Sequence, residues 1–189
     1  MTEGSFVGRR LIKPAKSGHF IGEMQISDYA LREGSRFYLV KGAVTMANVK
    51  FTTSAIAETP TRTLVTARQF KIVVDEPKGL GGSDNGPNPV EYVLASVSGC
   101  LNVVGHVVAS EMGFELKGLT IEAEGVLDPA RFQGTSYNER AGYKEIHIRL
   151  KPEANVDKQT LEKWRATISD RCPVSDNLSN VTPVSITLA

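Results

Sequence analysis

The chain has 189 residues, 22 Lys and Arg against 21 Asp and Glu, and a hydrophobic fraction of 41%. This length predicts one domain with at most a small appendage, and the apolar content excludes a chain dominated by disorder. The balanced charge excludes a nucleic-acid-binding protein that works through a basic patch, and two cysteines exclude a disulfide scaffold.

The first residues lack the apolar stretch that is typical of a secretory signal peptide. The pair Leu11-Ile12 lies between Arg9-Arg10 and Lys13-Pro14, which is too short for such a stretch. We therefore expect a cytoplasmic protein, in which two thiols normally stay reduced. In that compartment a cysteine pair is either inert packing or a site of redox chemistry.

Residues 1–48 differ in composition from the rest of the chain. They carry seven Lys and Arg against four Asp and Glu, they are punctuated by Gly and Ser, and their periodicity is weak apart from a short strand-like run at 37–40. We interpret them as an N-terminal arm, either strapped onto a partner subunit or poorly ordered. Residues 49–189 then form the main domain.

Strand-like runs rich in Thr, Val and Ile open this domain at 49–58, 62–68 and 70–74. A loop rich in Gly, Asp and Asn follows at 78–87. It precedes a helix, but it lacks the G-x-G-x-x-G and Walker patterns of phosphate-binding loops. The sequence therefore does not favour a nucleotide site here.

A long helix is predicted from 89 to 112. Asn88 fits the N-cap, Pro89 the first helical position and Glu91 the third, and Gly113 fits a C-terminal stop. No charged residue lies between Tyr92 and Ser110.

A helix that is apolar nearly all round is either buried or crosses a membrane. Interrupting Ser, Asn and Gly residues favour the buried helix, and we expect no membrane association. One small domain covers such a helix poorly, so we expect two copies to pack helix against helix, with Ala95, Gly99 and Gly105 allowing close approach.

The remaining elements complete an α+β pattern. Alternating apolar residues predict half-buried antiparallel strands around 119–123 and 146–150. A helix from about 157 ends at Cys172-Pro173, because a residue before proline avoids the helical region. A polar segment at 175–180 and a last strand at 183–188 follow. Strands, helix, strands, helix and strand predict an α+β fold.

The two cysteines are the first candidates for chemistry. A single buried cysteine is usually a small hydrophobe, whereas a reactive one needs a nearby cation to stabilise its thiolate. The helix neighbours of Cys100 carry no charge, so an activating group must come from another element or another subunit. Candidates are Arg62 and Arg68, which share one face of the predicted 62–68 strand, and Arg171, which precedes Cys172.

Other cofactor chemistry finds no support in the sequence. The three His and two Cys do not show the spacing of a metal site, such as C-x-x-C or H-x-x-x-H. We therefore expect no bound metal and no bound cofactor.

Several segments together resemble the OsmC/Ohr family, named for an osmotically inducible protein and an organic hydroperoxide resistance protein. The residues that carry the resemblance are Gly86-Pro87-Asn88-Pro89-Val90-Glu91-Tyr92-Val93-Leu94-Ala95, Gly99-Cys100, Cys172-Pro173-Val174 and Thr182-Pro183-Val184. The resemblance covers roughly residues 50–189, about three quarters of the chain, and fits an OsmC-like branch.

This resemblance implies a fold and an activity. The fold is an intertwined homodimer, with antiparallel sheets wrapped around long central helices and active sites at the dimer interface. The activity is a thiol-dependent peroxidase that prefers organic hydroperoxides and needs neither metal nor haem. Cys100 would be the peroxidatic thiolate and Cys172 the resolving thiol, and an external dithiol or a lipoylated protein would reduce their disulfide.

The resemblance also implies an arginine that activates the thiolate and a glutamate that holds this arginine. Arg62 or Arg68 is expected in the first role. Glu91 lies one place later than the family glutamate, so it is either catalytic or only a helix cap. An alternative function is a non-peroxidatic OsmC-like dimer that binds an apolar small molecule at its interface or senses oxidation.

Overall fold

The computed structural model describes residues 28–33, 36–41 and 48–188. These residues belong to two compact units, Met1–Phe51 and Thr52–Ala189, whereas the expected boundary lay between residues 48 and 49. The first unit holds an antiparallel hairpin of β1 (Asp28–Glu33) and β2 (Arg36–Lys41), and the strand expected at 37–40 lies in β2. The rest of the predicted arm, apart from Asn48, lies outside the described residues.

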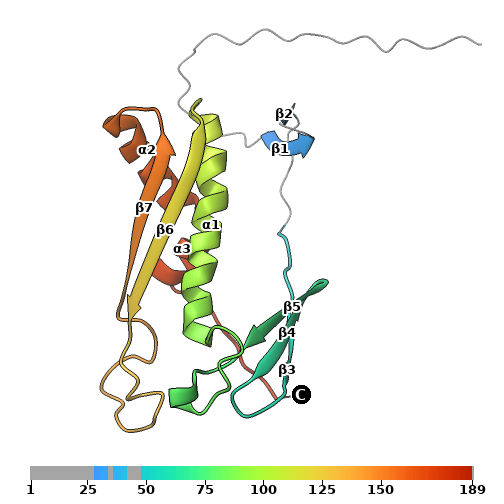
Figure 1. Ribbon diagram of the computed structural model, residues 1–189, viewed down its shortest axis with the longest axis vertical. Coiled ribbons are helices and arrows are strands. Elements are labelled where there is room, and N and C mark those ends of the chain that lie inside the picture. The colour runs from blue at the N-terminus through green and yellow to red at the C-terminus, as the bar shows by residue number, and fades with distance from the viewer. Residues whose placement is uncertain (1–27, 34–35, 42–47, 189) are drawn as a thin grey trace, which may run out of the picture. The chain divides into compact units, whose positions relative to one another are not determined.

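The second unit begins with a three-stranded antiparallel sheet of order β3-β4-β5 (Figure 1). Its strands are β3 (Ser54–Ala57), β4 (Thr63–Ala67) and β5 (Phe70–Val74), followed by a short 3-10 helix, η1 (Lys78–Leu80). The three predicted strands are therefore confirmed, the first two in shortened form. Tyr92 donates a hydrogen bond from its hydroxyl to the Val73 carbonyl at 2.7 Å, which joins this sheet to the helix that follows.

The predicted long helix is α1 (Pro89–Glu111), and its capping box is present as expected. It packs against β6, α2 and α3. Within the described residues it is the one helix long and apolar enough to cross a membrane by length and composition, a test that core helices of soluble proteins also pass. Its covered side is lined by buried residues, which include Val97, Leu101 and Val108.

The second half of the unit covers that side of α1. Strands β6 (Leu116–Val126) and β7 (Glu145–Ala154) pair antiparallel and run alongside α1 in Figure 1. Helices α2 (Lys158–Arg171) and α3 (Pro173–Ser179) complete the packing. The core consists of Val97, Leu101, Val108, Ala109, Leu116, Trp164, Ile168 and Cys172.

Two expectations for the C-terminal region are wrong. The segment at 175–180 is not simply a polar connection, because residues up to Ser179 belong to α3. Residues 183–188 form no strand in the described chain, and Val184 and Ile186 are 81% and 93% exposed. An extended segment becomes a strand only where a partner strand takes up its backbone hydrogen bonds.

The role expected for Gly105 is also wrong, because this glycine faces its own chain. A Cβ at this position would lie 3.1 Å from the Trp164 ring and 3.3 Å from Leu119. The Trp164 indole N–H donates to the Gly105 carbonyl at 2.8 Å. Gly99, in contrast, has open space around its Cβ position. The missing side chain at Gly105 therefore lets α2 approach α1 within one protomer.

Candidate functional site

The fold brings Cys100 and Cys172 together from positions 72 residues apart in the sequence. Cys100 lies midway along α1 and is half-buried, whereas Cys172 lies between α2 and α3 and is fully buried. Cys100 packs against the core cluster to which Cys172 belongs, and both thiols are free. Each thiol also shifts the pKa of the other.

The position of Cys172 follows from its local sequence. Trp164, Ile168 and Cys172 recur every four residues, so they point into the core from one side of α2. Pro173 ends α2 and supplies the first position of α3. Cys172 thereby becomes the N-cap of α3, and its Sγ accepts a hydrogen bond from the Ser175 backbone N–H at 3.4 Å.

The pKa values of the two thiols shift in opposite directions. Burial works to raise the pKa of Cys172, but hydrogen bonds from Ser175 and from the Val174 backbone outweigh it, so the pKa lies below its ordinary value. For Cys100, burial and the adjacent Cys172 raise the pKa, and a hydrogen bond from the Val174 backbone offsets only part of this. Within the chain, the hydrogen bonds at the start of α3 favour the thiolate of Cys172.

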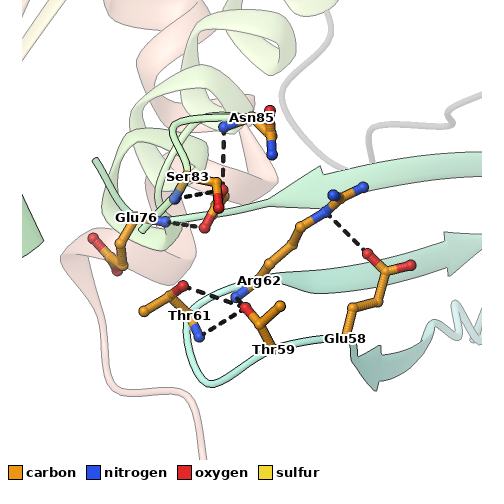
Figure 2. A network of polar contacts seen from close by, with 8 residues as sticks. Glu58, Thr59, Thr61, Arg62, Glu76, Ser83 and Asn85 are labelled. Atoms are coloured by element: carbon orange, nitrogen blue, oxygen red, sulfur yellow. Dashed lines mark hydrogen bonds and ion pairs between the residues drawn. The ribbon is translucent and has the colours of Figure 1, made fainter. Parts of the chain in front are cut away.

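Neither predicted arginine is among the groups that shift the pKa of Cys100 within the chain. Arg62 precedes β4 and forms an ion pair with Glu58, with 2.9 Å between Nε and Oε2, as Figure 2 shows. Arg68 follows β4 with a φ of 55°, and its guanidinium lies 5.0 Å from the centre of the Phe70 ring. The two arginines therefore flank β4 rather than share one of its faces.

The other two charged candidates also have partners within the protomer. Arg171 forms an ion pair with Glu111 that links the ends of α2 and α1. Glu91 accepts a hydrogen bond from the Asn88 backbone N–H at 2.8 Å, while the Asn88 side chain accepts from the Glu91 N–H at 2.9 Å. Glu91 is therefore part of the capping box at the start of α1.

Glu58 is a polar residue of interest that the sequence did not single out. Glu58 meets Arg62 because the hairpin register pairs Ala57 with Thr63 and leaves both residues in the connecting turn. The sequence signal for this ion pair is a carboxylate that precedes an arginine by four residues, with a turn between them.

Asp75 is fully buried at the end of β5, where its carboxylate accepts backbone N–H groups of Glu76, Ser83 and Asn85 at 2.9–3.2 Å (Figure 2). Burial works to raise the pKa of Asp75, but these bonds and the Thr61 side chain hold it below its usual value. The carboxylate thus orders the Gly-rich loop that leads into α1. Among the described residues, no group of three or more His, Cys, Asp or Glu could hold a metal ion.

Comparisons with known proteins agree on the fold. The OsmC-like protein family model matches residues 81–187. An OsmC-like protein from Mycoplasma pneumoniae is 18% identical with a TM-score of 0.62, and the match covers 71% of this chain and 91% of that chain. An organic hydroperoxide resistance protein OsmC from Legionella pneumophila is 19% identical, with a TM-score of 0.53 and coverage of 70% and 91%.

A third similar structure is an organic hydroperoxide resistance protein from Elizabethkingia anophelis with bound thiocyanate. It is 18% identical with a TM-score of 0.53, and the match covers 69% of this chain and 89% of that chain. No curated protein matches the chain. The solved structures confirm the α+β fold predicted from the sequence.

Proposed function

The chain belongs to the OsmC-like protein family, and from this premise we propose that it is a thiol-dependent peroxidase that reduces organic hydroperoxides with Cys100 and Cys172. One observation carries the proposal: two free cysteines from different elements meet in the core. Cys100 is the more accessible of the two, which suits the thiol that meets the peroxide. Two working thiols also suit a reducing compartment, so we place the protein in the cytoplasm.

The proposed cycle has three steps. The Cys100 thiolate attacks the outer oxygen of the hydroperoxide, the O–O bond breaks, and the peroxide leaves as an alcohol after taking up a proton. The Cys100 sulfur is now a sulfenic acid, which the Cys172 thiol attacks to form a disulfide and release water. An external dithiol or a lipoylated protein then reduces the disulfide by thiol–disulfide exchange.

A second copy of the chain is part of this proposal, because within a single chain the pKa of Cys100 is raised by burial and by Cys172. On the uncovered face of α1, Ala95, Gly99, Val103 and His106 are all exposed, and the apolar residues of 183–188 are exposed as well. A helix this apolar calls for cover on both sides. We propose that two copies bury these surfaces in an intertwined homodimer.

Arg62 is the arginine best prepared to activate Cys100 of a second copy. It forms an ion pair with Glu58, and it is not among the groups that shift the pKa of Cys100 in its own chain. A cation beside Cys100 would oppose the effect of burial and lower the pKa of its thiol. Glu58 rather than Glu91 is then the glutamate that holds the arginine.

Peroxide consumption by cysteine variants tests the proposal. With cumene hydroperoxide and excess dithiol, Cys100→Ser should consume no peroxide above the background of the dithiol alone. Cys172→Ser should complete one fast turnover and then stall, because its sulfenic acid has no resolving partner. Serine is a good N-cap, so the fold at the start of α3 is retained in this variant. Full activity of Cys100→Ser would refute the mechanism.

A second candidate function is favoured by the raised pKa of Cys100. In a non-peroxidatic OsmC-like dimer, Cys100 would remain a protonated thiol, and the protein would bind an apolar small molecule at its interface or sense oxidation. The pH dependence of Cys100 alkylation in Cys172→Ser distinguishes the two functions. A midpoint below the pKa of about 8.5 of a free thiol supports the peroxidase, and a midpoint above it supports the second function.

A further inference from the structure

A cavity of about 530 Å³ lies between α1, β7, α3 and the loop at 127–144. This volume is in the range of small-molecule sites. Three residues of one α1 stripe, two alternate residues of β7 and one residue of α3 form its apolar wall: Val90, Val93, Val97, Ile146, Ile148 and Leu178. The wall follows α1 for about 10 Å at 1.5 Å rise per residue.

The loop that forms the rim of the cavity is held in place. Tyr143 donates its hydroxyl to the Val90 carbonyl at 2.9 Å, which ties the loop to the first turn of α1. The Tyr143 ring lies over Gly125, where a Cβ would come within 2.5 Å of a ring carbon. The rim is therefore packed against both α1 and β6.

The charges at the rim differ in whether they already have partners. Lys144 pairs with Glu139 at 3.1 Å and with Asp128 at 3.7 Å. Arg140 forms no ion pair with any residue that the structure describes. Arg140 lines the cavity, and its guanidinium lies close to Gly142. The carboxylate of Glu145 also lies on the lining, and it pairs with His147 at 3.3 Å. An unpaired guanidinium on the lining of a cavity with an apolar wall complements a ligand with a carboxylate and a hydrocarbon chain.

We infer that this cavity binds a linear aliphatic carboxylate, with its chain along the wall from Val90 to Val97 and its carboxylate on Arg140. The site does not depend on thiol chemistry, and it goes beyond the proposed peroxidase activity. At 100° per residue, this stripe lies opposite the exposed α1 face of Ala95 and Gly99.

Calorimetric titration of the full, reduced chain with decanoate below its micelle concentration tests the inference. Decanoate should bind at one site per protomer, and octanoate should bind about fifteenfold more weakly, because each buried methylene is worth about fourfold in affinity. Decanol, which lacks the charge, should bind at least about tenfold more weakly than decanoate.

Two arginine variants separate the proposed contact from a general charge effect. Arg140→Gln should weaken decanoate binding about tenfold, since a hydrogen bond to a charged group is lost. Arg149→Gln also removes one positive charge, but Arg149 lies on β7, where it pairs with Glu122. This variant should bind decanoate like the parent chain. Cys100→Ser should also bind normally, so a failure of the peroxidase proposal is distinguishable from a failure here.

Three results would overturn the inference. The first is no decanoate binding, as expected if a second copy fills the cavity. The second is equal affinity for decanoate and decanol, and the third is unchanged decanoate affinity in Arg140→Gln. Each of these would show that Arg140 and the apolar wall do not form a carboxylate site.

Discussion

Substitutions at Glu91 test whether this residue works in catalysis or only caps α1. Its carboxylate accepts the Asn88 N–H at 2.8 Å, and in return Asn88 caps the Glu91 N–H. Glutamine also serves at this position of a capping box, so Glu91→Gln keeps an acceptor and loses only the charge at the helix N-terminus. That charge is worth about 0.3–1 kcal/mol at an exposed site.

Glu91→Ala loses the hydrogen bond as well as the charge. A hydrogen bond of this kind contributes about 0.5–1.5 kcal/mol, so we expect the free energy of unfolding to fall by roughly 1–2 kcal/mol. Asn88→Ala is the matched control, because it removes the other half of the capping box at a cost of about 1 kcal/mol. Urea denaturation followed by the fluorescence of Trp164, the one tryptophan of the chain, measures these losses.

Peroxide consumption should remain near the parent rate in all three variants, provided that each is assayed well below its unfolding midpoint. Glu58→Gln should behave in the opposite way, with normal stability but slower peroxide consumption, because Arg62 loses the carboxylate that holds it. A Glu91→Gln protein that is fully folded but inactive would refute the reasoning and would place Glu91 in the chemistry.

Two further predictions concern the packing and the loop that position α1. Gly105→Ala should destabilise the fold by up to about 2 kcal/mol. Overpacking against Trp164 costs about 1–3 kcal/mol, which outweighs a gain of about 1 kcal/mol in helix propensity. A variant at least as stable as the parent in urea denaturation would contradict this. Asp75→Asn should lower the melting temperature at neutral pH, because the pKa of the Asp75 carboxyl lies below its usual value in the folded protein. The ionised carboxylate therefore stabilises the fold fully above the unfolded pKa of about 3.9, and this stabilisation is lost as the pH falls through the folded pKa. The difference from the parent should therefore shrink in acid, and a difference independent of pH would contradict the role given to Asp75.

The elements that could be predicted from the sequence are those set by local rules. The start of α1 depends on Asn88, Pro89 and Glu91, which interact within one turn. Its end depends on Gly113, whose φ of 79° suits glycine. The alternation in β6 and β7 likewise depends only on which side of each strand is buried.

The features that the sequence did not predict depend on contacts between distant residues or with a partner. Helix α3 begins where the sulfur of Cys172 accepts the Ser175 N–H, and cysteine is not a usual capping residue. Gly105 lies against Trp164 only once α2 has folded back onto α1. The expected strand at 183–188 has apolar alternation but needs a neighbouring strand, and the described chain supplies none.

The candidate site also has features that could be predicted from the sequence and features that could not. The pairing of Cys100 with Cys172 came from a resemblance between motifs, whereas the ion pair of Arg62 with Glu58 depends on the register of the β3–β4 hairpin. The pKa of Cys100 depends on burial and on the Val174 backbone of a distant element, so the direction of its shift could not be predicted from the sequence around Cys100.

The most direct test of the proposed peroxidase is a count of free thiols. Reduced protein is mixed with one equivalent of cumene hydroperoxide, quenched within seconds, and titrated under denaturing conditions. The proposed cycle predicts that both thiols disappear together and that peptide mapping finds a disulfide between Cys100 and Cys172. Two thiols that survive for minutes would contradict the cycle.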